Sequence, residues 1–359
     1  MKALFFDSIS SDIHPVTQKI VERTKIFSLV THYETDIYRV AVLREKFGID
    51  GQRCKSAIAY RQKDKMKSLC EINEVNIPKF QKYNVHKEVS EEIKAKFNFP
   101  LVVKPVDGLG SASTWIVESS EELLDVLNKC SEEFLVEEYI DGDLFHVDGI
   151  VSNEELIFVN ASKYFGTTLN YLEDLPVGSY VLDQESEDAK RLITFATKVL
   201  KSLPNTQSYV FHCELFMKND GEIVFGEIAS RPPGALVPQV LNHVYGFNIN
   251  QVHILQQVGK VYEKNEFSIK VNKVSAWLTF PPKAGRLRCL QEEIPEQYCV
   301  EEIYRNYNIG EIYSSGDSVG SYVLGVVLVS YSEAVLLNNC KLLSDWFNDN
   351  FIFENKKIK

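Results

Sequence analysis

Apolar and polar positions alternate with two periods along this chain, and the first 60 residues contain both. A period of two predicts a strand, and a period near 3.6 predicts a helix. The expected elements are a strand at 3–6, a helix near 16–23, a strand at 26–30 and an amphipathic helix at Ile37–Phe47, which Gly48 ends. These alternating elements predict a small α/β domain over residues 1–60.

The central part of the chain is richer in neighbouring strands. Ser119 and Glu122 have capping-box spacing at a helix start, and Asn219-Asp220-Gly221 is a hairpin signal. The expected elements are a helix at 61–74, strands at 101–103, 114–117, 134–140 and 146–151, a helix at 187–203, and strands at 209–217 and 222–228. We therefore predict one domain over residues 61–265, with a flap subdomain at about 95–135.

The last part of the chain is again rich in strand signals. Strands are expected at Val274–Phe280 and 320–330, before a final helix. Residues 266–359 are thus predicted to form a carboxy-terminal α/β extension. The fold class expected for the whole chain is α+β.

Composition and charge fit a folded protein and exclude some classes of partner. The 359 residues are 45% hydrophobic and 25% charged, as in soluble domains, and exceed the ~250–300 residues that one core serves. The net charge of −11 repels nucleic-acid phosphates and anionic lipids. Apolar runs fall short of the ~18–20 residues that span a bilayer, and the first run meets Asp7 too early for a signal peptide. We expect a cytoplasmic protein without nucleic-acid or membrane partners.

A lysine and a loop of small residues follow one predicted strand. Residues 99–113 have the sequence FPLVVKPVDGLGSAS, in which Lys104 offers a cation and the loop with Gly108 and Gly110 offers backbone N–H groups. A Walker A motif would need Gly-Lys-Ser/Thr, and a dinucleotide fingerprint would need a helix after the loop, where a strand is expected. The segment indicates either a hairpin flap that covers a triphosphate or a tight turn with a surface lysine.

Two glutamates are expected side by side on the later hairpin. In the run FHCEL, His212 and Glu214 share one strand face and the apolar residues share the other. A short turn can set Glu227 of the next strand beside Glu214, and adjacent carboxylates repel unless a cation separates them. Arg231 lies an even number of positions beyond Glu227 and is expected on the same face. This pattern predicts a Mg²⁺ site, or alternatively a solvated face on which Glu and Arg pair.

Five short motifs occur in an order that resembles the ATP-grasp superfamily, specifically its carboxylate–amine ligases of the L-amino-acid ligase type. They are Lys63 on a helix, Val103-Lys104-Pro105 with its loop, Val136-Glu137-Glu138-Tyr139-Ile140, Glu214, and Glu227-x-x-x-Arg231. The likeness covers about residues 60–260. Residues 265–359 are similar to the carboxy-terminal region of the amino-acid ligase branch, so the expected fold is ATP-grasp with a small amino-terminal domain and a β-rich extension.

The resemblance implies that ATP binds between two α+β subdomains together with Mg²⁺, as two ions for which Mn²⁺ can substitute. Lys63 and Lys104 would contact the α- and β-phosphates. The flap, with Gly108, Gly110 and Ser111, would cover the β- and γ-phosphates.

The resemblance also assigns the remaining site residues. Glu137 would lie near the adenine amino group, and the Glu138 carbonyl and Ile140 amide would lie on the adenine edge. Glu214 and Glu227 would hold the metal ions. Arg231 would steady the transferred phosphoryl group, which makes Arg231 and Lys104 the expected catalytic residues.

Three positions depart from the family pattern. Leu144 stands where an acid usually binds the ribose, so that Asp143 or Asp148 would have to substitute, and Ala229 stands where an asparagine often binds metal. Gln62 stands where an acid often precedes the helix lysine. These departures leave open that the site is altered or inactive.

The implied reaction is ATP-dependent ligation. A substrate carboxylate would attack the γ-phosphorus to give an acyl phosphate and ADP, and an amine would then displace phosphate to form an amide. The expected partners are small carboxylates and amines such as amino acids, and a homodimer is allowed. Two alternatives stay open: transfer of the acyl group to a carrier-protein thiol or a peptide, and a nucleotide-binding module without catalysis.

Two further features have both a structural and a functional interpretation. His146 and His212 are expected to be hydrogen-bonded structural histidines, with the orientation of substrate or ligands as the alternative. Residues 163–171, which combine aromatic and polar side chains with glycine, could line the acceptor pocket or form an ordinary covering loop.

Overall fold

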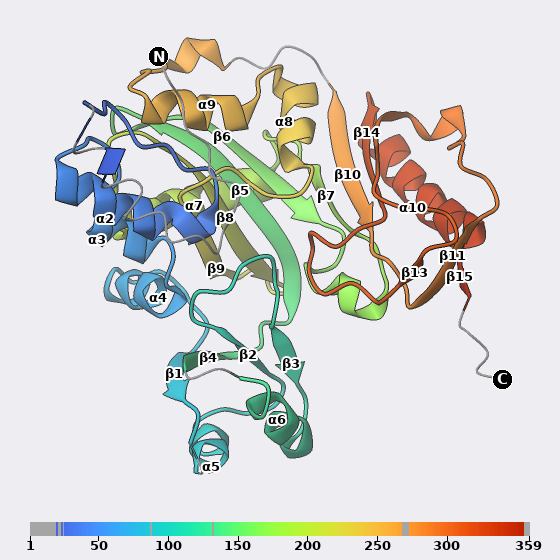
Figure 1. Ribbon diagram of the computed structural model, residues 1–359, viewed down its shortest axis with the longest axis horizontal. Coiled ribbons are helices and arrows are strands. Elements are labelled where there is room, and N and C mark those ends of the chain that lie inside the picture. The colour runs from blue at the N-terminus through green and yellow to red at the C-terminus, as the bar shows by residue number, and fades with distance from the viewer. Residues whose placement is uncertain are drawn as a thin grey trace.

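The computed structural model describes residues 19, 20, 23, 25–86, 88–130, 133–267 and 273–354. The expected strand at 3–6, and most of the expected helix at 16–23, lie outside these residues. The described part contains a small sheet with its own two helices, drawn at the bottom of Figure 1, and a large sheet above it. The strand pairs of these sheets are antiparallel, as is typical of the α+β class.

The small sheet carries the flap. Helices α5 (Val89–Lys94) and α6 (Ser120–Leu127) pack on it through a shared apolar cluster. The strands, in spatial order, are β1 (Phe80–Asn84), β4 (Glu133–Glu138), β2 (Leu101–Pro105) and β3 (Trp115–Val117). Ser119 caps α6 as expected, because its Oγ accepts from the Glu122 amide at 3.2 Å, while the Glu122 carboxylate accepts from the Glu118 amide at 2.8 Å.

The large sheet extends across the predicted boundary near residue 265. The strands, in spatial order, are β12 (Val300–Arg305), β14 (Leu324–Ser330), β10 (Val274–Phe280), β7 (Val177–Val181), β6 (Glu155–Tyr164), β5 (Gly142–Ser152), β8 (Tyr209–Lys218) and β9 (Ile223–Ala229). A third sheet has the order β13 (Ile312–Tyr313), β11 (Gly285–Cys289) and β15 (Phe351–Glu354). The domain boundaries at 60 and 265 stay predictions.

Helices cover both faces of the large sheet (Figure 1). Helices α4 (Lys63–Ile72) and α7 (Glu187–Ser202) share one apolar cluster with β5, β8 and β9. Helices α8 (Val237–Tyr245) and α9 (Ile249–Gln257) pack on the opposite face, and α10 (Glu333–Asn350) packs on β10 and β14. Among the helices built from described residues, none combines the length and the apolar character that crossing a membrane requires.

The amino-terminal segment differs in part from the expectation. Helix α2 (Ile37–Phe47) ends at Gly48 as predicted, and α3 (Cys54–Ala59) follows. The expected strand at 26–30 is wrong, because side chains rather than a neighbouring strand bind this backbone. Arg44 donates to the Leu29 carbonyl, and the Ser28 hydroxyl donates to the Gln257 carbonyl on α9. Just beyond the segment, Gln257 Nε2 donates to the Thr31 carbonyl at 2.8 Å. The segment is thus an irregular strap held by α2 and α9.

Candidate active site

A cavity lies between the small sheet and the large sheet. Its wall combines strand β2 and the flap with the end of β4, the start of β5 and the middle of β8 and β9. The predicted site residues that line it are Lys63, Lys104, Gly108, Ser111, Glu137, Glu138, Ile140, Glu214 and Glu227. Among the described residues, the predicted Gly110 and Arg231 do not line this cavity. One cavity therefore collects residues that lie up to 164 positions apart, from Lys63 to Glu227.

Glu214 and Glu227 are direct neighbours across β8 and β9. The turn between the strands is short, since the Lys218 amide donates to the Glu222 carbonyl at 2.9 Å and leaves the three residues of the predicted hairpin signal between them. That register alone would set Glu214 opposite Gly226. A β-bulge at Gly226 shifts the register by one residue and brings Glu227 onto the face of Glu214. The predicted pairing of the two carboxylates is confirmed.

Gly226 is required where the bulge forms. A Cβ atom at this position would lie 2.9 Å from the Glu214 carbonyl oxygen. The Gly226 carbonyl accepts from Lys67 Nζ at 2.7 Å, and Lys67 is fully buried on α4. Helix α4 therefore holds the bulge through one buried hydrogen bond.

Glu137 lies between two lysines, of which Lys104 lines the cavity with it. Glu137 Oε2 lies 2.9 Å from Lys104 Nζ, and Glu137 Oε1 lies 3.4 Å from Lys67 Nζ. Burial would raise the pKa of Glu137, but Lys104 and Lys67 hold it below its usual value. Burial lowers the pKa of Lys67 to about 8, whereas the pKa of Lys104 is raised because Glu137 and Glu227 outweigh its burial. The Glu137 carboxylate is thus bound to lysines within the protein.

Lys63 joins the metal-site candidates to the flap. Its Nζ lies 3.1 Å from Glu227 Oε2 and donates to the Gly108 carbonyl at 2.8 Å. Burial would raise the pKa of Glu227, but Lys63 and Lys104 lower it, so the carboxylate is charged at neutral pH. Lys63, the flap and Glu227 therefore meet at one end of the cavity.

The flap contacts the connection between β6 and β7, which includes much of the segment 163–171 considered above as a pocket lining. Ser111 Oγ donates to Thr168 Oγ1 at 2.8 Å, and the Tyr171 hydroxyl donates to the Ser111 carbonyl at 3.0 Å. Thr167, Thr168 and Leu169 line the cavity. Ser111 and Gly110 both have positive φ, at 58° and 60°, so the flap tip is a tight left-handed turn.

Arg231 pairs with a residue that the sequence analysis did not identify. Its Nε and Nη2 both donate to Glu34 Oε2, at 2.8 and 2.5 Å. Glu34 Oε1 lies 3.3 Å from Arg61 Nη1, which also donates to the Gly108 carbonyl at 3.2 Å. Glu34 thus links two arginines, and through Arg61 it links the amino-terminal strap to the flap.

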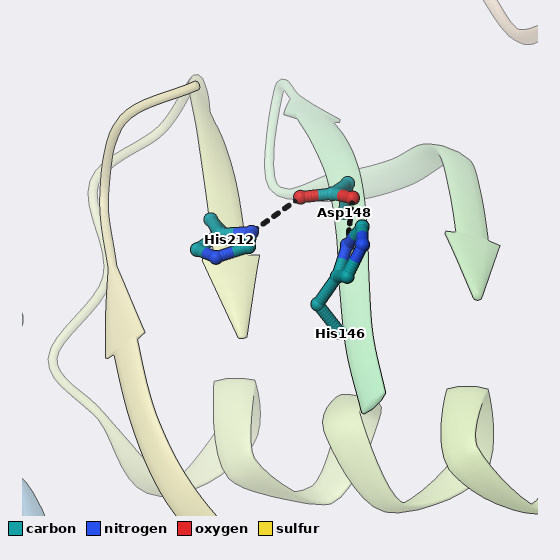
Figure 2. Close-up of side chains that lie close together, drawn as sticks. All are labelled: His146, Asp148 and His212. Atoms are coloured by element: carbon teal, nitrogen blue, oxygen red, sulfur yellow. Dashed lines mark hydrogen bonds and ion pairs between the residues drawn. The ribbon is translucent and has the colours of Figure 1, made fainter. Parts of the chain in front are cut away.

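A row of buried polar side chains runs along the large sheet toward Glu214. Figure 2 shows Asp148 between two histidines: Oδ2 lies 2.7 Å from His146 Nδ1, and Oδ1 lies 2.7 Å from His212 Nδ1. His146 Nε2 lies 2.8 Å from Ser179 Oγ, which accepts from Trp277 Nε1 at 2.7 Å. The row confirms the predicted hydrogen-bonded role of both histidines, and it begins on β10 of the carboxy-terminal extension.

The neighbours of Asp148 and His212 favour the charged form of each of these two side chains. Burial would raise the pKa of Asp148, but the two histidines hold it far below its usual value. Burial would lower the pKa of His212, yet Asp148 and Glu214 raise it to about 9. Tyr164 completes the contacts of Glu214, because its hydroxyl donates to Glu214 Oε1 at 3.0 Å.

Leu144 and Ala229, which depart from the pattern of the resembled family, both lie near the candidate site. Leu144 lines the cavity, and Ala229 lies directly opposite His212 in the β8/β9 ladder. Asp143 pairs with Lys163 at 2.7 Å, and Asp148 is fully buried between the histidines. Asp148 is therefore committed to the histidines, which removes one of the two acids expected to replace Leu144.

Lys67, Tyr164, Arg61 and Glu34 are the site residues that the sequence analysis missed. Lys67 carried a signal, since it follows Lys63 by four positions on a predicted helix and so shares its face. Arg61 lies two residues before Lys63. Tyr164 belongs to the aromatic and polar segment 163–171. Glu34 reaches the site only through tertiary packing, and no local pattern marks it.

Comparisons with known proteins agree with this architecture. The ATP-grasp domain family matches residues 62–235. An L-arginine-specific L-amino acid ligase from Bacillus subtilis is 24% identical over 230 residues, which are 62% of this chain and 55% of that protein. The match thus spans about half of the relative's length.

Solved structures share the fold over most of the chain. An L-amino acid ligase from Bacillus licheniformis has a TM-score of 0.76 and 20% identity, covering 97% of this chain and 86% of that one. Carboxyaminoimidazole ribonucleotide synthase from Aspergillus clavatus, complexed with ATP, has a TM-score of 0.68 and 12% identity, covering 88% and 80%. Residues 62–235 thus match the ATP-grasp domain family, and the chain has the ATP-grasp fold.

Proposed function

We propose that this protein is an ADP-forming ligase that activates a carboxylate as an acyl phosphate and joins it to an amine. One observation carries the proposal: Glu214 and Glu227 are cross-strand neighbours in the wall of a cavity that Lys63 and Lys104 also line. The two carboxylates would bind metal ions and the two lysines would bind phosphates, as a nucleoside triphosphate with its metal ions requires. No side-chain nucleophile is needed, because the substrate carboxylate is itself the nucleophile.

The residues present fit ATP and Mg²⁺. The face shared by Glu214 and Glu227 offers oxygen ligands, and their mutual repulsion favours a divalent cation between them. Lys63 and Lys104 would contact the phosphates, and Glu138 and Ile140 would offer main-chain groups to adenine. Mg²⁺, for which Mn²⁺ could substitute, would supply charge neutralisation at the transferred phosphoryl group.

Glu137 takes a different role in this proposal from the one the family resemblance implies. Its carboxylate is bound to Lys67 and Lys104, so it would hold Lys104 in place for the phosphates. The Gly108 carbonyl now accepts from Lys63, and a bound phosphate would compete for the same Nζ. Binding of the nucleotide would therefore move the flap.

Arg231 would steady the acyl phosphate after releasing or sharing Glu34. The two arginines and one carboxylate of this cluster leave one positive charge uncompensated, which suits a substrate carboxylate or a phosphoryl oxygen. Ligation then proceeds by attack of the carboxylate on the γ-phosphorus, release of ADP, attack of the amine on the acyl carbon and loss of phosphate. The chain would position these groups and exclude water.

The test is a screen for ADP and phosphate release. The full chain with ATP and Mg²⁺ is given pairs of L-amino acids, beginning with L-arginine because of the relative's name, and products are identified by mass spectrometry. Release that needs both a carboxylate and an amine supports the proposal. Acyl transfer only to a carrier thiol would favour the second activity, and tight ATP binding without ADP release would favour a nucleotide-binding module. Light scattering would test a homodimer.

A further inference from the structure

His212 presents one ring nitrogen toward the metal-site glutamates. A carboxylate can only accept hydrogen bonds, so both Nδ1 atoms at Asp148 carry the proton and donate to it (Figure 2). His212 therefore keeps Nε2 for another contact. That atom lies 3.6 Å from Glu214 Oε1, which exceeds the ~3.2 Å limit of an ordinary N–H···O hydrogen bond.

The separation suits two ligands of one metal ion. Ligand atoms that each lie ~2.1 Å from an ion are ~3–4 Å apart when they are neighbours in its coordination shell. His212 and Glu214 share one face of β8, and Glu227 lies opposite Glu214 on β9. The residue opposite His212 is Ala229, whose methyl side chain offers no ligand and leaves space on this face.

The surroundings of His212 are those of a metal-binding histidine. Such histidines almost always donate the second ring N–H to a carboxylate, which fixes the tautomer and the ring orientation. Asp148 accepts that bond and is itself fixed by His146, which Ser179 holds on its other side. The His212 side chain is 11% exposed, so part of its imidazole ring is accessible from outside the core.

We propose that His212 Nε2 is a third, nitrogen ligand beside the carboxylates of Glu214 and Glu227, oriented by Asp148. This inference rests on the proposed metal site. It assigns His146, Asp148 and His212 to the support of that site, although these three lie close enough to form a metal site themselves. Their 2.7 Å separations are hydrogen-bond distances, and both oxygens of Asp148 are already used.

A nitrogen ligand changes which ion the site prefers. Mg²⁺ favours oxygen ligands, whereas imidazole suits transition-metal ions. We expect Mn²⁺ to bind at least tenfold more tightly than Mg²⁺, and His212→Gln to remove most of this difference.

Pulsed electron paramagnetic resonance of the full chain with Mn²⁺ and ADP tests the inference without any turnover. Nitrogen coupling to Mn²⁺ that changes when the protein is made with ¹⁵N-histidine identifies a histidine ligand. Coupling that disappears in His212→Gln and persists in His243→Gln assigns it to His212. His243 is a suitable control because it pairs with Glu302 on β12, remote from β8 and β9 in the sheet order.

The outcomes separate the inference from the proposed function. Mn²⁺ that binds with oxygen ligands only, in a site lost in Glu227→Gln, would overturn the role of His212 and keep the two-glutamate site. Absence of Mn²⁺ binding in the wild-type protein would overturn both. The labelled wild-type spectrum decides the matter even if a variant folds poorly.

Discussion

Lys67 Nζ donates to the carbonyl oxygen of Gly226 at 2.7 Å, and this bond ties helix α4 to the bulge beside Glu214 and Glu227, the two proposed metal ligands. The lysine is completely buried, and Glu137 is its charge partner. The geometry of the proposed metal site thus depends on Lys67, which is not among the described residues that line the cavity.

Gly226→Ala tests the role of the bulge. The new Cβ would meet the Glu214 carbonyl at 2.9 Å, so β9 must shift and Glu227 must move relative to Glu214. We expect the Mg²⁺ concentration needed for half-maximal ADP release to rise about tenfold. Gly320→Ala is the control, because a Cβ atom at position 320 would lie 3.8 Å from its nearest neighbour, Ser318 Oγ. An unchanged Mg²⁺ requirement in Gly226→Ala would show that the bulge does not set the site.

Lys104→Met is expected to weaken nucleotide binding tenfold or more, because it removes a cation from the cavity wall. It also leaves Glu137 with a single lysine, and breaking a buried pair costs about 3–5 kcal/mol of unfolding free energy. The double variant Lys104→Met/Glu137→Gln should recover part of that stability but not the affinity. Calorimetric titration with ADP measures both variants against Lys190→Met on the exposed side of α7, and unchanged affinity would remove Lys104 from the site.

The flap is expected to close when nucleotide binds. Lys63 and Arg61 hold the Gly108 carbonyl, and a phosphate would compete for these cations. Amide hydrogen exchange over residues 108–113 should slow with an ATP analogue and Mg²⁺, with β14 as an internal reference. Equal exchange in both states would describe a static turn.

His253 is expected to make the protein acid-sensitive. Burial lowers its pKa to about 4, and its Nε2 donates to the Thr31 carbonyl at 3.0 Å. The unfolded chain takes up the proton near pH 6.5 while the folded chain does not, so the unfolding free energy falls between pH 6.5 and 4, by on the order of 3 kcal/mol. Denaturant unfolding of wild type and His253→Gln at pH 7, 5 and 4 checks this. Parallel pH profiles would assign the acid sensitivity to other groups.

Local patterns predicted the elements that bear the site. Helix α2 and strand β10 have the predicted bounds, and β10 is mostly apolar because it is buried within the large sheet. The alternation of polar and apolar residues along β8 predicted that His212 and Glu214 share one face of this strand. The pairing of Glu214 with Glu227 was predicted through a short turn, and it forms because the bulge at Gly226 shifts the register that the three-residue turn sets.

The remainder depends on contacts that no local pattern encodes. Arg231 and Glu34 are separated by 197 positions, and neither segment signals the other. Strand β7 includes glycine and serine and so has a weak strand signal, whereas β6 begins with the apolar run LIFV and could have been found. The sheet order, with extension strands beside β7, follows only from tertiary packing.

Glu227→Gln tests the central claim most directly, because it keeps the size of the side chain while removing its charge. The carboxylate is 37% exposed and pairs with Lys63, so we expect little change in the thermal unfolding temperature and no gain in stability. The measurement is ADP release as a function of Mg²⁺, with Glu222→Gln on the exposed hairpin as the matched control. The account predicts a loss of turnover by orders of magnitude and a higher Mg²⁺ requirement in Glu227→Gln only. Normal turnover at normal Mg²⁺ in a folded Glu227→Gln protein would contradict the two-glutamate site, and with it the ligase proposal.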